Sequence, residues 1–180
     1  DTFDLKILGG SVEFDYILDP FSGSGAGTLA NPYKISNCTQ LQEIDDARTS
    51  HYELVNNIDC SDTINWNGGA GFEPIGFMGL STNDFFSGSL QGNDYNITNL
   101  YIKNSSSKGF VGLFGYTINA TINKVHLWNV YIEGNGTGGG NTIVVGGLVG
   151  AFDDNGTISN SSVHGNVTSK GFTYSTGGLA

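Results

Sequence analysis

The sequence predicts an all-β protein built as a parallel β-helix (β-solenoid), with a small N-terminal cap that contains one short helix. The first observation is a Gly-Leu phrase that occurs three times, at Gly112-Leu113-Phe114-Gly115, Gly147-Leu148-Val149-Gly150 and Gly178-Leu179-Ala180. The copies begin 35 and 31 residues apart, a spacing typical of stacked supersecondary units. The second is that each copy from which the chain continues leads into an apolar segment centred on an isoleucine. The third is composition, since 28 glycines suit tight corners of a repeating coil.

The chain carries a formal net charge of −10, and the charge is unevenly placed. Residues 1–90 hold 13 of the 17 acids, whereas residues 91–180 hold four acids and four lysines. A nearly neutral repeat region, with one arginine in the whole chain, could not neutralise many phosphates. Composition therefore argues against nucleic-acid binding and against anionic polysaccharides. No stretch approaches the roughly 18 apolar residues of a membrane span, so we expect no membrane insertion.

Residues 1–20 predict a separable N-terminal strand pair that is available for intermolecular pairing. Apolar and polar residues alternate over 3–7 and 12–16, with Gly9-Gly10 between them as a turn. The stretch 22–32 is rich in Gly, Ser and Ala and ends at Asn31-Pro32, which breaks regular structure.

Residues 21–84 predict the cap and the first part of the solenoid. A short strand is expected at 33–36, and a short helix follows from Thr39, which has capping-box spacing with Gln42. A further strand is expected over 52–55, with Ile58 leading into Cys60, and then a loop through Trp66.

The two cysteines, Cys38 and Cys60, both lie in this cap. An even count without histidines at ligand spacing favours a disulfide in an exported chain, and the alternative is two unconnected thiols.

We expect residues 85–180 to form the coils of the solenoid. Aligned on their isoleucines, three apolar sets share spacings of three and two: Ile97, Leu100, Ile102; Ile122, Val125, Leu127; and Ile158, Ser161, Val163. This alignment places the sets 25 and 36 residues apart, so a loop of variable length is expected in each coil. Stacked coils would bury the apolar side that one coil leaves exposed.

The phrase at 147–150 is followed by 155–160 (Asn-Gly-Thr-Ile-Ser-Asn), and the phrase at 112–115 by 119–122 (Asn-Ala-Thr-Ile). These segments resemble the GLUG-motif repeat proteins, and the phrases at 31–36, 58–60 and 74–76 are similar to that family's N-terminal cap. The resemblance covers residues 22–180 and implies a right-handed parallel β-helix in a secreted or surface-exposed protein. It implies no common catalytic site, and family members include adhesins.

The chain contains eight Asn-x-Ser/Thr sequons, more than its Ser and Thr content gives by chance. They begin at Asn37, Asn96, Asn104, Asn119, Asn135, Asn155, Asn160 and Asn166. One interpretation is an N-glycosylated surface, which implies export. The alternative is that solenoid corners favour Asn-Gly-Thr for turn geometry alone.

No motif for catalysis stands out. Asp94 and Glu133 are isolated, Asp153-Asp154 predicts a turn before Asn155-Gly156, and the three histidines (His51, His126, His164) do not align in one ladder. We therefore expect no enzyme, catalytic residue, metal site or cofactor. The aromatic residues Tyr95, Tyr101, Trp128 and Tyr131 could stack on sugars, although core or corner packing is the commoner role.

These observations predict a non-catalytic extracellular protein at the cell surface with a structural or adhesive role. An uncovered solenoid end would accept another strand, and the strands at 3–7 and 12–16 of a neighbouring molecule could supply it. Such a head-to-tail contact propagates as a filament. Further repeats of the same chain are the competing partner. The alternative function is a carbohydrate-binding or carbohydrate-active β-helix module for neutral glycans.

Overall fold

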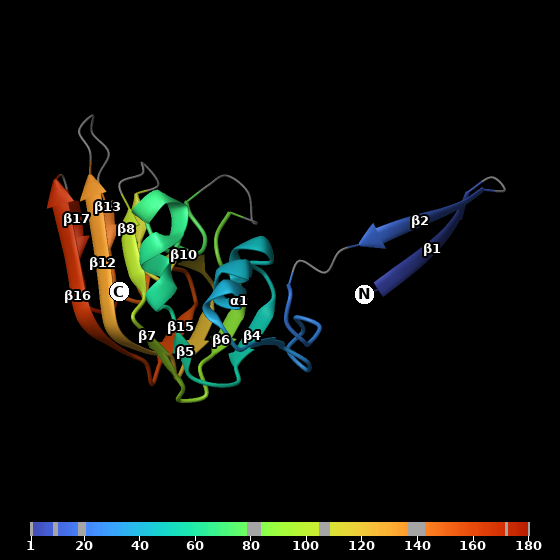
Figure 1. Cartoon of the computed structure of the whole chain (residues 1–180), viewed down its shortest axis with the longest axis horizontal. Helices are drawn as coiled ribbons and strands as arrows, with labels where there is room; N and C mark the ends of the chain where they lie inside the picture. The colour runs from blue at the N-terminus through green and yellow to red at the C-terminus, as the bar shows by residue number, and fades with distance from the viewer. Residues whose placement is uncertain are drawn as a thin grey trace.

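The computed structural model describes residues 2–8, 11–17, 21–78, 84–104, 109–136, 143–171 and 173–179, with backbone alone for 2–8, 11–17, 104, 171 and 173–176. The protein is all-β, and most of its strands lie in parallel sheets (Figure 1). The single α-helix of the described residues, α1 (Cys38–Gln42), lies in the N-terminal third.

Two five-stranded arrangements form the largest sheets. The first sheet has the order β15-β11-β6-β4-β3, with strands Thr157–Ser159, Thr121–Asn123, Ser89–Gln91, His51–Leu54 and Tyr33–Ile35. The second has the order β16-β12-β7-β5, with strands Ser162–Gly171, His126–Gly136, Asn96–Thr98 and Ile58–Asp59, and β8 (Tyr101–Asn104) also pairs with β12. Every pairing in these sheets is parallel.

Two smaller parallel sheets complete the arrangement. One has the order β17-β13-β9, with strands Thr173–Thr176, Ile143–Val145 and Phe110–Val111. The other pairs β10 (Phe114–Ile118) with β14 (Val149–Asp153). From β6 onward the chain passes through the sheets in a repeating order, so that each strand lies beside the corresponding strand of the next pass.

The observed register corrects the predicted apolar alignment in one place. Ile122 lies in register with Ile158, 36 residues later, as expected. The predicted 25-residue offset is wrong, because Ile97 lies beside Leu127, 30 residues later, and the upstream partner of Ile122 is Leu90.

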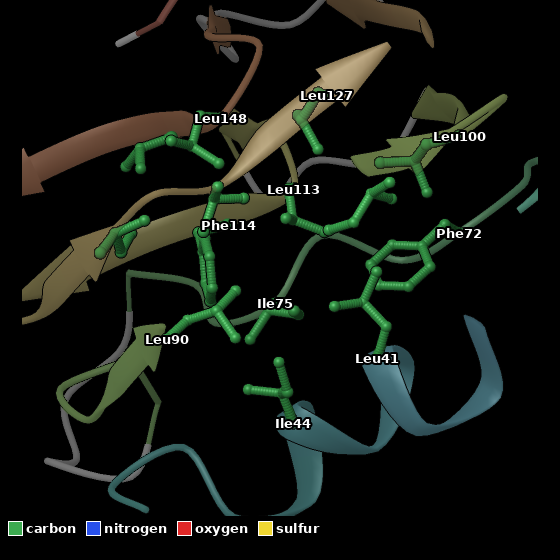
Figure 2. Close-up of a cluster of buried hydrophobic side chains, with 14 of the residues drawn as sticks. Leu41, Ile44, Phe72, Ile75, Leu90, Leu100, Leu113, Phe114, Leu127 and Leu148 are labelled. Carbon is green, nitrogen blue, oxygen red and sulfur yellow. The ribbon is translucent and has the colours of Figure 1, made fainter. Parts of the chain in front are cut away.

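The core lies between the sheets and the helical cap (Figure 2). Figure 2 shows Leu41 and Ile44 from the helical segment pointing toward side chains from the sheets, among them Leu90 and Phe114. All four are at most 1% exposed. Burial of an apolar side chain of this size contributes roughly 1.5–3 kcal/mol, so the cap is bound to the sheets by the same core that holds the coils together.

The three Gly-Leu phrases stack on one another in the described residues. Leu113 N–H donates to the carbonyl of Gly147, and Gly147 N–H donates to that of Gly178. A Cβ at Gly147 would lie 2.3 Å from the Gly178 carbonyl oxygen, so the close backbone approach requires glycine there. Ile75, upstream of the three phrases, pairs with Phe114 and extends the stack by one segment.

In the N-terminal cap, the helices begin and end at other residues than predicted. Asn37, and not Thr39, caps α1, because its Oδ1 accepts from Gln40 N–H at 2.9 Å. The helix continues as the 3-10 helix η1 (Glu43–Asp46), and the expected loop through Trp66 contains η2 (Ser61–Gly69), which is interrupted by a kink with non-helical backbone at Trp66, Asn67 and Gly68. The predicted disulfide between Cys38 and Cys60 is present and joins α1 to the residue after β5.

The predicted N-terminal strand pair is confirmed. β1 (Thr2–Leu8) and β2 (Ser11–Ile17) are antiparallel, with Phe3 opposite Tyr16 and Ile7 opposite Val12. The Gly9-Gly10 turn lies outside the described residues. Among the residues that are described, no helix has the length and apolar character needed to cross a membrane.

Candidate functional site

The candidate functional site is the C-terminal edge, defined as the outer sides of β15, β16 and β17. Within the described residues each of these strands has a neighbour on one side alone: β11, β12 and β13 respectively. A strand with one free side presents unpaired backbone N–H and C=O groups to any further strand. β16 is ten residues long and contributes the longest part of this edge.

Core-facing side chains are incompletely covered at the C-terminal edge. Leu90, Ile122 and Ile158 lie in register on neighbouring strands of the first sheet. Leu90 is 1% and Ile122 0% exposed, whereas Ile158 is only partly buried. The second sheet repeats this pattern, because Val163 and Val167 of β16 are only partly buried. Another strand on this edge would remove more apolar surface from water, which is favourable at about 25 cal/mol per Å².

The opposite end of the first sheet is covered by the chain itself. Phe21 is 3% exposed and packs on Tyr33 and Tyr52, with ring centroids 4.6 and 5.7 Å away. The carbonyl of Ser24 accepts from Lys34 N–H at 2.8 Å, which pairs part of the outer side of β3. The two ends of the stack are therefore different surfaces.

A buried carboxylate joins β12 to β16 at the C-terminal edge. Glu133 is 2% exposed, and its Oε2 accepts from Lys170 Nζ at 2.6 Å and from the hydroxyl of Tyr131 at 2.7 Å. The hydrogen bond from Lys170, followed by that from Tyr131, lowers the pKa of Glu133. The same contact raises the pKa of Lys170. Glu133 is thus an ionised partner in an ion pair, unlike a general acid, whose pKa must be raised.

Two of the other acidic residues considered from the sequence, Asp94 and Asp153, have hydrogen-bond partners of their own. Lys124 donates to Asp94 at 3.0 Å and lowers the pKa of that carboxyl. Tyr116 donates to Asp153 at 3.0 Å, and Asp154 has φ of 60°, which confirms the predicted turn.

The aromatic residues do not form one strip. Tyr101 and Tyr131 stack on each other, Trp128 stacks on His164 with centroids 4.0 Å apart, and Tyr95 packs against the core. One face of each stacked ring is thus engaged within the protein, while Trp128 remains 46% exposed.

The three histidines do not align in one ladder, as predicted, because their partners in register are Ser89, Ser162 and Trp128. The Nδ1 atoms of His51 and His126 lie 2.8 and 2.9 Å from the hydroxyl oxygens of Ser89 and Ser162, while His164 stacks on a tryptophan. Over the described part of the chain, no group of three or more His, Cys, Asp or Glu side chains is placed to hold a metal ion.

The sequon asparagines fall into three groups by exposure. The exposed ones are Asn37, Asn119, Asn155, Asn160 and Asn166; the half-buried ones are Asn96 and Asn135; and the side chain of Asn104 lies outside the described residues. Some are already hydrogen-bonded: Asn160 Nδ2 donates to Asn123 Oδ1 at 3.1 Å, and Asn119 Oδ1 accepts from Asn155 N–H at 3.2 Å.

Comparison with known proteins gives sequence relatives but no family. No family model matches the chain. Halomucin of Haloquadratum walsbyi is 39% identical over 150 residues, which are 79% of this chain and 2% of halomucin. A provisionally named Gly-rich membrane protein of Evansella cellulosilytica is 34% identical over 146 residues, which are 79% of this chain and 15% of that protein. The chain thus spans a small part of both relatives.

One solved structure has a similar fold. It is a Bacteroides ovatus protein provisionally named an immunoglobulin A1 protease, and it matches with a TM-score of 0.50 and 17% identity. The match covers 79% of this chain and 51% of that one. At this identity the likeness concerns the fold alone.

Proposed function

We propose that the chain is a non-catalytic structural or adhesive module of an extracellular surface protein, built as a right-handed parallel β-helix of the GLUG type. The repeating order of the parallel sheets supports this architecture. The Cys38–Cys60 disulfide supports export, because such bonds persist mainly in oxidising compartments. The relatives named halomucin and Gly-rich membrane protein support a place at the cell surface.

The observation that carries the proposal is the difference between the two ends of the stack. The N-terminal end is covered by Phe21, whereas the C-terminal edge leaves Ile158, Val163 and Val167 partly exposed in strands that are paired on one side alone. A second copy of the chain occupies this edge by strand addition, through its β1 or β2 strand, each seven residues long. Because the contact joins unlike surfaces, it continues from copy to copy as a filament.

The absence of catalysis is part of this proposal. Glu133 and Asp94, which could have served as acids, are ion-paired and have lowered pKa values. Such carboxylates are poor proton donors at neutral pH.

The assembly can be tested by electron microscopy and size-exclusion chromatography. Three proteins are compared: the full chain, a variant lacking residues 1–20, and Val163→Lys. Filaments are expected for the full chain and for neither variant, since one lacks the added strand and the other places a charge in the apolar edge. Val55→Lys is the matched control, because it makes the same substitution at a valine that is 39% exposed and follows β4, which β6 and β11 separate from β15. A monodisperse monomer for the full chain would overturn self-association and leave further repeats of the same polypeptide as the partner.

A further inference from the structure

A groove lies on the outer face of the first sheet, over the strands inside its C-terminal edge. It has a volume of about 510 Å³, within the roughly 300–1,000 Å³ of sites that hold small ligands. Its floor is formed by neighbouring strands, with His51 and Glu53 from β4, Ser89 and Gln91 from β6, and Thr121 from β11. Leu29 and Pro32 supply an apolar wall.

The chemistry of the groove suits a neutral polyhydroxyl ligand. Gln91 Oε1 accepts from Asn123 Nδ2 at 2.9 Å, which fixes the amide and leaves its Nε2 as a donor. Glu53 is paired with Lys34, and this contact lowers the pKa of the carboxyl, so that it stays an acceptor. No lysine or arginine is among the described residues that line the groove, so the lining does not favour an anion. Leu29, 76% exposed, offers an apolar surface to the C–H face of a sugar ring.

Asn119 lies at the same groove and begins a sequon, Asn119-Ala120-Thr121. Its backbone has φ of 55°, in the turn between β10 and β11, and its side chain is exposed. Asn155 N–H donates to Asn119 Oδ1 at 3.2 Å, which holds the carboxamide in place and leaves Nδ2, the atom that carries an N-linked sugar, outside that bond. Thr121, the third sequon residue, also lines the groove.

We infer that Asn119 is an N-glycosylation site and that the first sugars of its glycan lie in this groove, bound by the polar side chains of β4 and β6 and the apolar wall at Leu29. The attachment makes binding intramolecular, so weak contacts suffice to hold the sugars. This inference rests on the proposed export of the chain, because modification requires a glycosylating secretory route.

The test expresses the full chain, with a secretion signal, in a eukaryotic host and maps glycopeptides by mass spectrometry. Asn155 is the matched control, since it begins the sequon of the corresponding turn one repeat later, is exposed, and does not line the groove. We expect occupancy at Asn119. We also expect an endoglycosidase to remove its glycan from the native protein about tenfold more slowly than the Asn155 glycan, because a docked glycan is cleaved only when it opens. After denaturation both should be removed at equal rates.

A groove variant separates docking from simple burial. Leu29→Ala with Gln91→Ala leaves the sequon intact and should bring native cleavage at Asn119 to the rate at Asn155. An unoccupied Asn119 beside other occupied sequons, or equal native cleavage rates at both sites in the unmodified protein, would overturn the inference and leave the proposed module untouched. A secreted chain with every sequon empty would overturn it as well, while filament formation by that chain would still report separately on the proposed function.

Discussion

The ammonium of Lys170 in β16 donates a 2.6 Å hydrogen bond to the buried carboxylate of Glu133 in β12. This pair fastens the strand at the C-terminal edge to its inner neighbour. We predict that Lys170→Met lowers the free energy of unfolding, because Glu133 then keeps its charge in a buried place with Tyr131 as its remaining hydrogen-bond donor. Adding Glu133→Gln should recover part of the loss, which urea unfolding of the four proteins of a double-mutant cycle would measure. Equal losses with and without Glu133→Gln would contradict the coupling.

The pKa values predict loss of stability in acid. The pKa of Glu133 in the folded protein lies below its ordinary value of 4.5, so its contribution is fully present above pH 4.5 and is lost as the pH falls through the lowered folded value. Lys34 lowers the pKa of Glu53 in the same way. Urea unfolding at neutral pH and near pH 3 should therefore show a decrease, and Glu133→Gln should show a smaller one. A decrease of the same size in that variant would rule out Glu133 as a source.

Removal of the disulfide should destabilise the cap. Cys38 and Cys60 are 22 residues apart, and a bridge over such a loop contributes about 3 kcal/mol by restricting the unfolded chain. The double variant Cys38→Ser with Cys60→Ser is expected to lose about this much in thermal or urea unfolding. A reducing agent should destabilise the unmodified protein to the same extent and leave the double variant unchanged.

Ile122 and Ile158 lie in register on neighbouring strands, and we predict that truncating them to alanine lowers the free energy of unfolding by different amounts. Ile122 is 0% exposed between two neighbouring strands, so Ile122→Ala should cost about 2–5 kcal/mol. Ile158 is partly buried at the C-terminal edge, and Ile158→Ala in the monomer should cost less than half as much. In an assembled form the two costs should become similar, because a partner strand would cover Ile158. Chemical unfolding of both states measures the difference, and identical costs in the monomer would show that this end is already covered.

Glycine is required at Gly147 and not at Gly178. A Cβ at Gly147 would lie 2.3 Å from a carbonyl oxygen and 2.6 Å from a methyl carbon of Val163, whereas nothing lies within 4 Å of a Cβ at Gly178. Gly147→Ala should therefore cost about 1–3 kcal/mol through forced displacement, and Gly178→Ala about 0.5 kcal/mol or less. Thermal unfolding of the two variants gives the comparison, and a tolerated Gly147→Ala would contradict the tight stacking.

Several features could be predicted from local sequence because their causes are local. Alternation over residues 3–7 and 12–16 indicated β1 and β2, and the repeated Gly-Leu phrase indicated which backbone segments stack. The disulfide followed from an even cysteine count with no histidine at ligand spacing in a chain expected to be exported. The helix cap was missed at Asn37, although Asn37 and Gln40 are also three residues apart, because Thr39 offered an equally suitable spacing.

The sequence by itself determined the parallel, repeating β architecture, since the Gly-Leu spacing and the short apolar segments require stacked strands. Only the tertiary structure decided the register. Leu127, Val130 and Ile132 have the same spacings of three and two as the set at 122–127, and Ile97 lies beside Leu127. The chain thus contains two successive apolar sets with the same spacings. The spacing alone cannot decide which of the two lies beside the set that begins at Ile97. Contacts between residues 30 to 40 positions apart depend on the lengths of the loops between them and on the packing of the whole core. The groove at Asn119 arises in the same way, because its walls come from segments that are brought together only when the coils stack.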